Sequence, residues 1–406
     1  MKRFIKETFK KNPLIHKLVV NHRLKKKQQL AKKYYESQDI DNKTIIFSSF
    51  YGREYSDSPR AIYEEMINDS YFDDYTFIWS FKEPEKYREI KELERAILIK
   101  NVSEEFFKCM YKSKYWVSNS RMYPYIEKRS EQILIQTWHG TPLKKIGCDI
   151  DVDGNNARHA KNELNNLYIE DAIKYDYMPS PSKYYSQCIK SAFRIDDTSK
   201  IHEIGYPRND ILKKYNVDKI NEIKEKFNID KKRKVIAYVP TWRDNKYQNG
   251  EYISDLEYDF FDYLKKELSD EYILIYRTHY FIANDFKFNK YSDFIVNGRI
   301  FEDINDLYLI SDMLITDYSS AFFDYANLNR KMIFYMYDYE EYKNKTRNFY
   351  LDIDALPGNI VKTKEALVKE INNDNFDINR VEKFNNEYNY LEDGYAAKRL
   401  VDDIFK

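Results

Sequence analysis

The sequence of 406 residues predicts an α/β protein with two parallel-sheet halves in series. Short apolar, β-branched runs alternate with helical stretches, a pattern typical of βαβ units. The alternation occurs in two series, separated by the charged stretch 216–233, which we interpret as a connector. The predicted division is therefore a basic segment 1–40, a first unit 41–220 and a second unit 221–406.

The first series begins at Thr44, where the run TIIFSSF has the composition of a buried strand. The strands expected in this half are Thr44–Phe50, Tyr75–Phe81, Ala96–Ile99, Tyr115–Ser118 and Ile133–Trp138. Helical patterns fall between them at Pro59–Asn68, Pro84–Leu93 and Glu104–Tyr111. The polar middle of the chain adds two more predicted helices, Ala157–Tyr175 and Lys183–Phe193.

The second series begins after the connector. Its expected strands are Val235–Val239, Tyr272–Tyr276, Phe294–Val296, Met313–Thr316 and Met332–Tyr335. Helices are predicted at Leu256–Leu268, Asn305–Ser311, Ala321–Asn327 and Glu382–Ile404. Ligands of open parallel sheets bind beyond the carboxyl ends of the strands, so we expect the site in a cleft between the two sheets.

Composition excludes several classes of protein. A hydrophobic content of 43% rules out global disorder. The nine glycines form neither the dinucleotide fingerprint nor the Walker loop. The three cysteines, Cys109, Cys148 and Cys188, form no C-x-x-C pair, which excludes a zinc ribbon and a disulfide scaffold. No metal-ligand motif and no G-x-S-x-G element stands at a strand end.

The zero net charge conceals an asymmetry. Residues 1–33 hold twelve Lys or Arg and one Glu, a net charge of +11, which leaves −11 for the rest. Apolar residues near helical spacing accompany these charges, and no run is long enough to span a membrane. We interpret the segment as a basic amphipathic helix on an anionic membrane surface, which would make the protein peripheral to the membrane. The alternatives are a solvated helix packed on the body and a flexible tail; nucleic-acid binding is disfavoured because the remainder is acidic.

The stretch Ile133–Gly147 (ILIQTWHGTPLKKIG) places His139 at the end of a predicted strand. Thr141 and Pro142 have the pattern of a helix cap and first turn, so Gly140 and Thr141 would offer backbone N–H groups to an anion. A histidine at this place can act as a general base. The alternative is a structural histidine in a tight turn.

Strand ends in the second half carry groups that bind phosphate. Arginines can grip phosphate oxygens bidentately, and serines at a helix start offer hydroxyl and amide donors. For Ser319 and Ser320 the alternative is a plain helix cap, and for Asp317 and Asp324 it is a surface position. Taken together, such groups at successive ends of one sheet favour a diphosphate site. They are Thr241, Arg243, Arg277, His279, Asp317, Ser319, Ser320 and Asp324.

Several motifs together resemble the CDP-glycerol glycerophosphotransferase family of teichoic-acid and capsular-polymer enzymes. The resemblance covers residues from about 44 to 400. It rests on SSFYGREYSDSPRAIYEEM (Ser48–Met66), QTWHGTPLKKIG (Gln136–Gly147), IGYPRND (Ile204–Asp210), YVPTWRD (Tyr238–Asp244), RTH (Arg277–His279) and TDYSSAFFDYA (Thr316–Ala326).

This resemblance implies a GT-B-like fold, with an acceptor-side unit and a nucleotide-binding unit facing each other across the active site. It implies transfer of glycerol phosphate from CDP-glycerol to a hydroxyl of a polymer acceptor, with release of CMP. The basic N-terminus fits an enzyme that works on a lipid-linked acceptor at the cytoplasmic face of the membrane. We expect no cofactor and no metal-ligating residue, and metal dependence stays open. His139 would deprotonate the acceptor, and His279 would assist the leaving group. The implied substrate-binding residues are Gly140, Thr141, Arg208, Thr241, Arg243, Arg277, Asp317, Ser319, Ser320 and Asp324.

Alternatives stay open at this point. A CDP-ribitol enzyme or a sugar-nucleotide glycosyltransferase could use the same fold, and a non-catalytic protein could bind anionic polymers or membranes. The chain lacks the large extra domains of some polymerases, which leaves a primase or single-addition enzyme possible.

Overall fold

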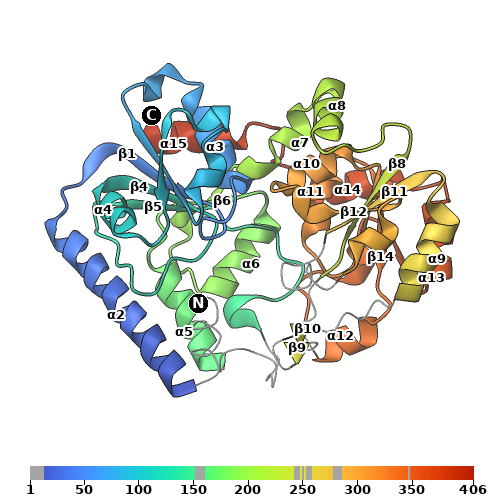
Figure 1. Cartoon of the computed structure of the whole chain (residues 1–406), viewed down its shortest axis with the longest axis horizontal. Coiled ribbons are helices and arrows are strands. Elements are labelled where there is room, and N and C mark those ends of the chain that lie inside the picture. Colours follow the sequence, from blue (N-terminus) through green and yellow to red (C-terminus); the bar gives the residue numbers. More distant parts are fainter. Residues whose placement is uncertain are drawn as a thin grey trace.

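Two parallel sheets lie side by side in the computed structural model, one in each half of the chain (Figure 1). The structure describes residues 13–150, 161–241, 247–248, 251–252, 258–277, 286–345 and 348–406. The first sheet has the strand order β3-β2-β1-β4-β5, and the second has the order β12-β11-β8-β13-β14-β15. Neighbouring strands in both are parallel, which confirms the predicted α/β class.

The first sheet is centred on β1 (Asp41–Ser48), whose residues Thr44–Phe47 are all buried. Burial of consecutive residues means that both faces of the strand are covered, as expected for a parallel sheet with helices on each side. The other strands are β2 (Thr76–Phe81), β3 (Ala96–Lys100), β4 (Ser113–Ser118) and β5 (Ile133–Gln136). The helices of this half are α3 (Asp57–Ile67), α4 (Glu104–Lys112), α5 (Lys161–Ala172) and α6 (Lys183–Phe193), with a short strand pair β6 (Met178–Ser180) and β7 (Ile201–Glu203).

The second sheet begins with β8 (Lys234–Val239), which lies at its centre. Its other strands are β11 (Tyr272–Tyr276), β12 (Ile295–Asn297), β13 (Met313–Thr316), β14 (Lys331–Tyr335) and β15 (Asn359–Val361). A separate pair is formed by β9 (Tyr247–Gln248) and β10 (Glu251–Tyr252). The helices are α9 (Tyr258–Leu268), α10 (Ile304–Ile310), α11 (Ala321–Ala326), α12 (Tyr339–Lys345), α13 (Lys364–Ile371) and α14 (Ile378–Tyr388).

Two predictions in the body of the chain, one of a helix and one of a connector, need correction. The segment predicted as one helix over Pro84–Leu93 forms two 3₁₀ turns, Pro84–Tyr87 and Lys91–Leu93. Its buried side chains, Tyr87 and Leu93, are six positions apart, which is not the spacing of one helical face. The predicted connector 216–233 contains α8 (Val217–Lys226), which follows α7 (Ile211–Lys214). Ile223 of α8 packs in the core of the second unit.

The C-terminal segment differs from the single predicted helix Glu382–Ile404. The chain leaves α14 at Asn389, turns through Gly394 with φ of +91°, and re-enters a helix as α15 (Ala396–Phe405). The Asp210 carboxylate caps α15 by accepting hydrogen bonds from the N–H groups of Ala396 and Ala397 at 2.9 and 2.8 Å. Figure 1 shows α15 beside α3, on the first unit, whereas the predicted division assigned this segment to the second.

The N-terminal helix α2 (Pro13–Ser37) lies along the edge of the first unit (Figure 1). Its last turns pack on α4, with Ala31 buried and with Lys33 Nζ 3.0 Å from a carboxylate oxygen of Glu104. Earlier basic residues, Arg23, Lys25 and Lys26, are exposed. Residues 1–12 of the predicted basic segment lie outside the described residues. Within the described part of the chain, no helix is both long enough and apolar enough to cross a membrane.

Candidate active site

A pocket of about 160 Å³ lies between the two sheets. In each sheet the strand order reverses at one place, between β1 and β4 in the first and between β8 and β13 in the second. Loops that follow strands at such reversals are the usual ligand site of open α/β sheets. Six of the predicted site residues line this one pocket: His139, Arg208, Arg277, Ser319, Ser320 and Asp324.

His139 is held in one tautomer. Its Nδ1 lies 2.7 Å from the backbone carbonyl oxygen of Asn119. A carbonyl only accepts, so Nδ1 carries the proton and donates, and in the neutral ring Nε2 keeps its lone pair. Desolvation in the pocket lowers the pKa of His139, outweighing the hydrogen bond to Asn119 that favours the protonated ring. The imidazole is therefore neutral at neutral pH and able to accept a proton at Nε2.

The backbone before His139 is strained. Trp138 has φ of +53°, a conformation that is costly for a bulky residue. Its N–H donates to the Gln136 side chain at 2.9 Å, and its ring packs edge-on against Phe193 in the core. The ring of His139 stacks on Trp138 with the centroids 4.3 Å apart. The buried Trp138 thus fixes the direction in which the histidine leaves the strand.

The loop after His139 is extended rather than helical, which corrects the helix start predicted at Thr141. Residues 143–145 pair with 348–350 of the second unit: the N–H of Lys145 donates to the carbonyl of Asn348, and that of Tyr350 donates to Leu143, both at 2.8 Å. These bonds require an extended backbone. Thr141 is buried at 2% exposure and does not line the pocket.

The two walls approach each other at Gly140, where a Cβ atom would lie 2.9 Å from Ser320 Oγ. Its φ of +152° is a conformation that residues with side chains rarely adopt, so the position favours glycine. Its N–H donates to the Tyr206 hydroxyl at 3.1 Å, and that hydroxyl donates to the carbonyl of Thr137 at 2.8 Å. Tyr206 therefore ties two of the sequence motifs into one structural unit.

Arg208 and Asp324 lie at the pocket, but their main contacts are with protein. The Arg208 guanidinium bonds Asp57 at 3.1 Å and Asp324 at 2.5 Å, and all three side chains are buried. Burial opposes the charge of Arg208, but the two carboxylates outweigh it and raise its pKa. Because Asp57 begins α3 and Asp324 lies in α11, the arginine joins the two units.

The second-unit wall carries Arg277, Ser319 and Ser320. The Nη1 atom of Arg277 donates to the carbonyls of Gly298, at 2.8 Å, and Phe301. Those bonds orient the guanidinium, which lines the pocket together with the carboxylates of Glu54 and Asp303. Both serines are partly exposed at the start of α11. This wall therefore presents N–H and O–H donors opposite His139.

The remaining predicted residues stand elsewhere. Asp317 is buried and accepts the N–H groups of Thr241 and Tyr318, at 2.8 and 2.5 Å, so it joins the ends of β8 and β13 without lining the pocket. Arg243 and His279 lie outside the described residues. Among the described residues, no group of three or more His, Cys, Asp or Glu side chains could hold a metal ion.

Sequence reasoning missed three residues that shape the site. Asn119 follows β4, and its side-chain oxygen accepts the N–H of Phe50 at 2.7 Å while its carbonyl holds His139. Asp57 anchors the ion network of Arg208, and Tyr206 anchors the loop of His139, Gly140 and Thr141. Asn119 could have been found by extending the survey of strand ends to β4, whereas Asp57 and Tyr206 gain their roles only from contacts distant in sequence.

The fold and site together define an α/β protein of GT-B type, with a histidine on one wall of the cleft and an arginine, two serines and two carboxylates, Glu302 and Asp303, on the other. The family model for CDP-Glycerol:Poly(glycerophosphate) glycerophosphotransferase matches residues 30–406. The chain belongs to this family.

Three relatives illustrate the similarity. A teichoic acid poly(glycerol phosphate) polymerase of Staphylococcus epidermidis is 37% identical over 416 residues, covering 100% of this chain and 56% of that protein. A Bacillus spizizenii protein of the same name is 38% identical over 373 residues, covering 90% of this chain and 92% of its own. The solved wall teichoic acid polymerase TagF superposes with a TM-score of 0.84 at 36% identity, over 95% of this chain and 94% of that one. The chain thus spans little more than half of the Staphylococcus epidermidis relative.

The ion network makes a prediction about stability. Replacing Arg208 by Gln leaves Asp57 and Asp324 buried without their partner, so we expect the free energy of unfolding to fall by about 3–5 kcal/mol in denaturant titrations. Lys398→Gln is the matched control, because it removes an exposed pair with Asp402 that is worth at most about 0.5 kcal/mol. A loss below about 1 kcal/mol for Arg208→Gln would show that the network does not fasten the units.

Proposed function

We propose that this chain transfers glycerol phosphate from CDP-glycerol to a hydroxyl of a polyol-phosphate or teichoic-acid-like acceptor, and releases CMP. The observation that carries the proposal is the neutral His139, whose Nδ1 is occupied by Asn119 and whose Nε2 is left for substrate. Membership of the glycerophosphotransferase family supplies the donor class. The relative of similar extent is called a polymerase, so the length of this chain does not argue against polymerisation.

In the proposed reaction, Nε2 of His139 takes the proton of the acceptor hydroxyl. The acceptor oxygen forms a bond to the glycerol-bearing phosphorus, and the bond from that phosphorus to the bridging diphosphate oxygen breaks. The electron pair leaves with CMP. Such a displacement gains most from positioning and from stabilising charge on the phosphoryl oxygens.

We assign the donor to the second unit. Arg277, Ser319 and Ser320 line the pocket opposite His139, which supports a role in holding diphosphate oxygens. For Thr241, Arg243 and His279 the support is the family motif alone. Gly140, Thr141, Arg208, Asp317 and Asp324 are better supported as positioning residues, since their contacts described above are with protein. The acceptor would then enter from the first unit.

We further propose that residues 1–33 hold the protein against the anionic cytoplasmic face of the membrane, where a lipid-linked acceptor would be presented. The exposed basic residues of α2 support this proposal, because each contributes about 1 kcal/mol of attraction near an anionic surface. Only the last turns of α2 pack on α4, which leaves the earlier turns for the membrane.

The first test is the release of CMP. We expect CMP from CDP-glycerol with a glycerol phosphate oligomer as acceptor, and a fall of about 10²–10⁴-fold in turnover for His139→Ala with donor binding retained in calorimetry. His202→Ala is the control, because that ring stacks on Tyr177 and does not line the pocket. Nucleotide release from CDP-ribitol or a UDP-sugar, but not from CDP-glycerol, would show that the proposed donor is wrong.

The pH dependence tests the protonation state of His139. The base is active when neutral, so activity falls as the pH drops through its pKa. Because desolvation lowers that pKa, we expect the acid limb of kcat/KM to lie below the ordinary histidine value of about 6.5. An acid limb above that value would contradict the assignment.

Vesicle binding tests the N-terminal helix. We expect Arg23→Gln, Lys25→Gln and Lys26→Gln together to weaken cosedimentation with phosphatidylglycerol vesicles, by about 3 kcal/mol at low salt. Three exposed lysines of the second unit, Lys362, Lys369 and Lys383, provide a control variant with the same loss of charge. Equal binding by the two variants would reject the proposed membrane contact.

A further inference from the structure

Arg121 is an arginine of the first unit that the functions assigned above do not use. It lies in the loop after β4, at the place where the strand order of the first sheet reverses. It lies two positions after Asn119, whose carbonyl accepts the hydrogen bond of His139 at 2.7 Å. The positive charge of Arg121 also opposes protonation of His139 and contributes to its lowered pKa, after desolvation. The rings between them also link the two residues: Tyr168, over which Arg121 lies, is 6.3 Å from Trp138 between centroids, and His139 stacks on Trp138.

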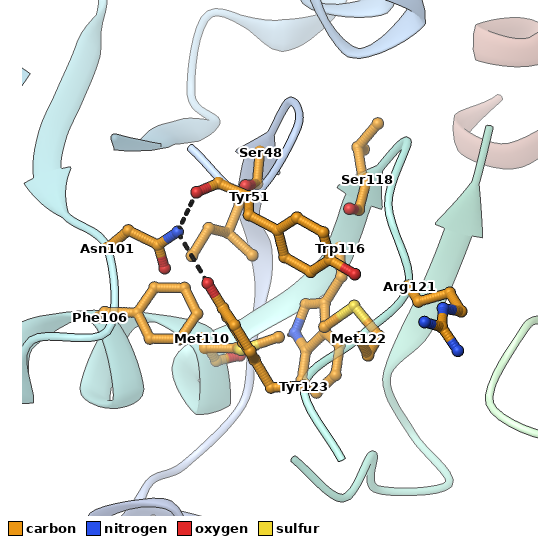
Figure 2. Close-up of a pocket in the computed structure, with 12 residues that line it drawn as sticks. Ser48, Tyr51, Asn101, Phe106, Met110, Trp116, Ser118, Arg121, Met122 and Tyr123 are labelled. Atoms are coloured by element: carbon orange, nitrogen blue, oxygen red, sulfur yellow. Dashed lines mark hydrogen bonds between the residues drawn. The ribbon is translucent and has the colours of Figure 1, made fainter. Parts of the chain in front are cut away.

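The guanidinium of Arg121 lies over an aromatic ring. Its central carbon lies 4.6 Å from the ring centroid of Tyr168. Tyr51 lies beside it, and Figure 2 shows the Tyr51 ring extending toward the Arg121 side of a small pocket. Stacking on a ring fixes the plane of a guanidinium and leaves its N–H edges available for a planar or bidentate partner.

Arg121 has no carboxylate partner among the described residues. Two other arginines of the first unit have acid partners: Arg60 pairs with Glu64, and Arg208 pairs with Asp57 and Asp324. Asp171, whose charge interacts with that of Arg121 without forming an ion pair, accepts hydrogen bonds from the hydroxyl of Tyr175 and the N–H of Met122. A half-buried arginine without an acid partner is suited to an anion supplied by a ligand.

The small pocket behind Arg121 does not itself hold that anion. Its volume is about 30 Å³, and its walls are mainly aromatic and apolar side chains such as Phe106, Met110 and Trp116 (Figure 2). This volume matches roughly one water molecule. A phosphate must therefore bind on the open side of the guanidinium.

We propose that Arg121, stacked on Tyr168 beside Tyr51, binds the last phosphodiester of the acceptor chain. The inference rests on the proposed function. In a polyol phosphate chain, the terminal hydroxyl and the preceding phosphodiester belong to the same polyol unit, so a base and a cation in neighbouring loops can hold both. Arg121 then selects acceptors that already carry a polyol phosphate, which makes elongation the favoured reaction of this site.

Two acceptors with the same terminal hydroxyl test the proposal. One is a glycerol phosphate oligomer, and the other carries neutral methylphosphonate linkages in place of the phosphodiesters. With saturating CDP-glycerol, we expect the unaltered enzyme to favour the charged acceptor about 10- to 100-fold in kcat/KM, the range of one charge-assisted contact. Arg121→Gln should lose this preference and keep its KM for CDP-glycerol.

Controls separate the possible failures. Arg121→Lys keeps the charge without the planar fork and should give an intermediate preference, whereas Arg380→Gln, in α14 of the second unit, should keep the full preference. If Arg121→Gln retained the preference, or if the unaltered enzyme showed none, the inference would be overturned. If the unaltered enzyme released no CMP with either acceptor, the proposed function itself would fail. Binding of CDP-glycerol by Arg121→Gln verifies that the variant is folded. The comparison of the two acceptors on the unaltered enzyme does not depend on the variant.

Discussion

The buried contact of Arg208 with Asp57 and Asp324 is the constraint on which the cleft depends. The walls of the pocket come from loops far apart in sequence, and Asp57 and Asp324 belong to different sheets. A buried ion network gives little net stability, because desolvation cancels most of the attraction, but a misplaced partner would be costly. It therefore specifies one relative position of the units. That position permits the close contact between Gly140 and Ser320, and it brings His139 into one pocket with Arg277 and Ser319.

The contacts of Asn119 and Trp138 fix the orientation of His139. The Asn119 carbonyl determines which ring nitrogen carries the proton, and the Asn119 side chain holds the backbone of Phe50, which lines the same pocket. The strained φ of Trp138 is offset by burial of its ring and by the Gln136 side chain. Strain that persists in a well-packed loop marks a position where direction matters more than local stability. The histidine is thus oriented before any substrate binds.

The sequence was sufficient for the elements whose burial is periodic or continuous. The strands at Tyr272–Tyr276 and Met313–Thr316 and the helix at Lys183–Phe193 were predicted at their observed bounds, because apolar runs of this kind carry their own signal. It failed where a distant partner decides the backbone. The residues after Gly140 have a good helix-start pattern, yet pairing with residues 348–350 extends them. The motifs also located the pocket but not the roles within it: Arg208 and Asp324 have the chemistry of ligand-binding residues, and only the fold shows that they bind each other.

The charges around His139 have a consequence for the order of events. Desolvation is the main cause of the lowered pKa of His139, and the positive charges of Arg208 and Arg121 add to it. Arg208 is paired with Asp57 and Asp324 in the protein, whereas the anion proposed for Arg121 would arrive with the acceptor. Binding of that anion would reduce the contribution of Arg121, while desolvation would still lower the pKa. The proposed base would therefore accept a proton more readily with the acceptor in place than before the acceptor binds.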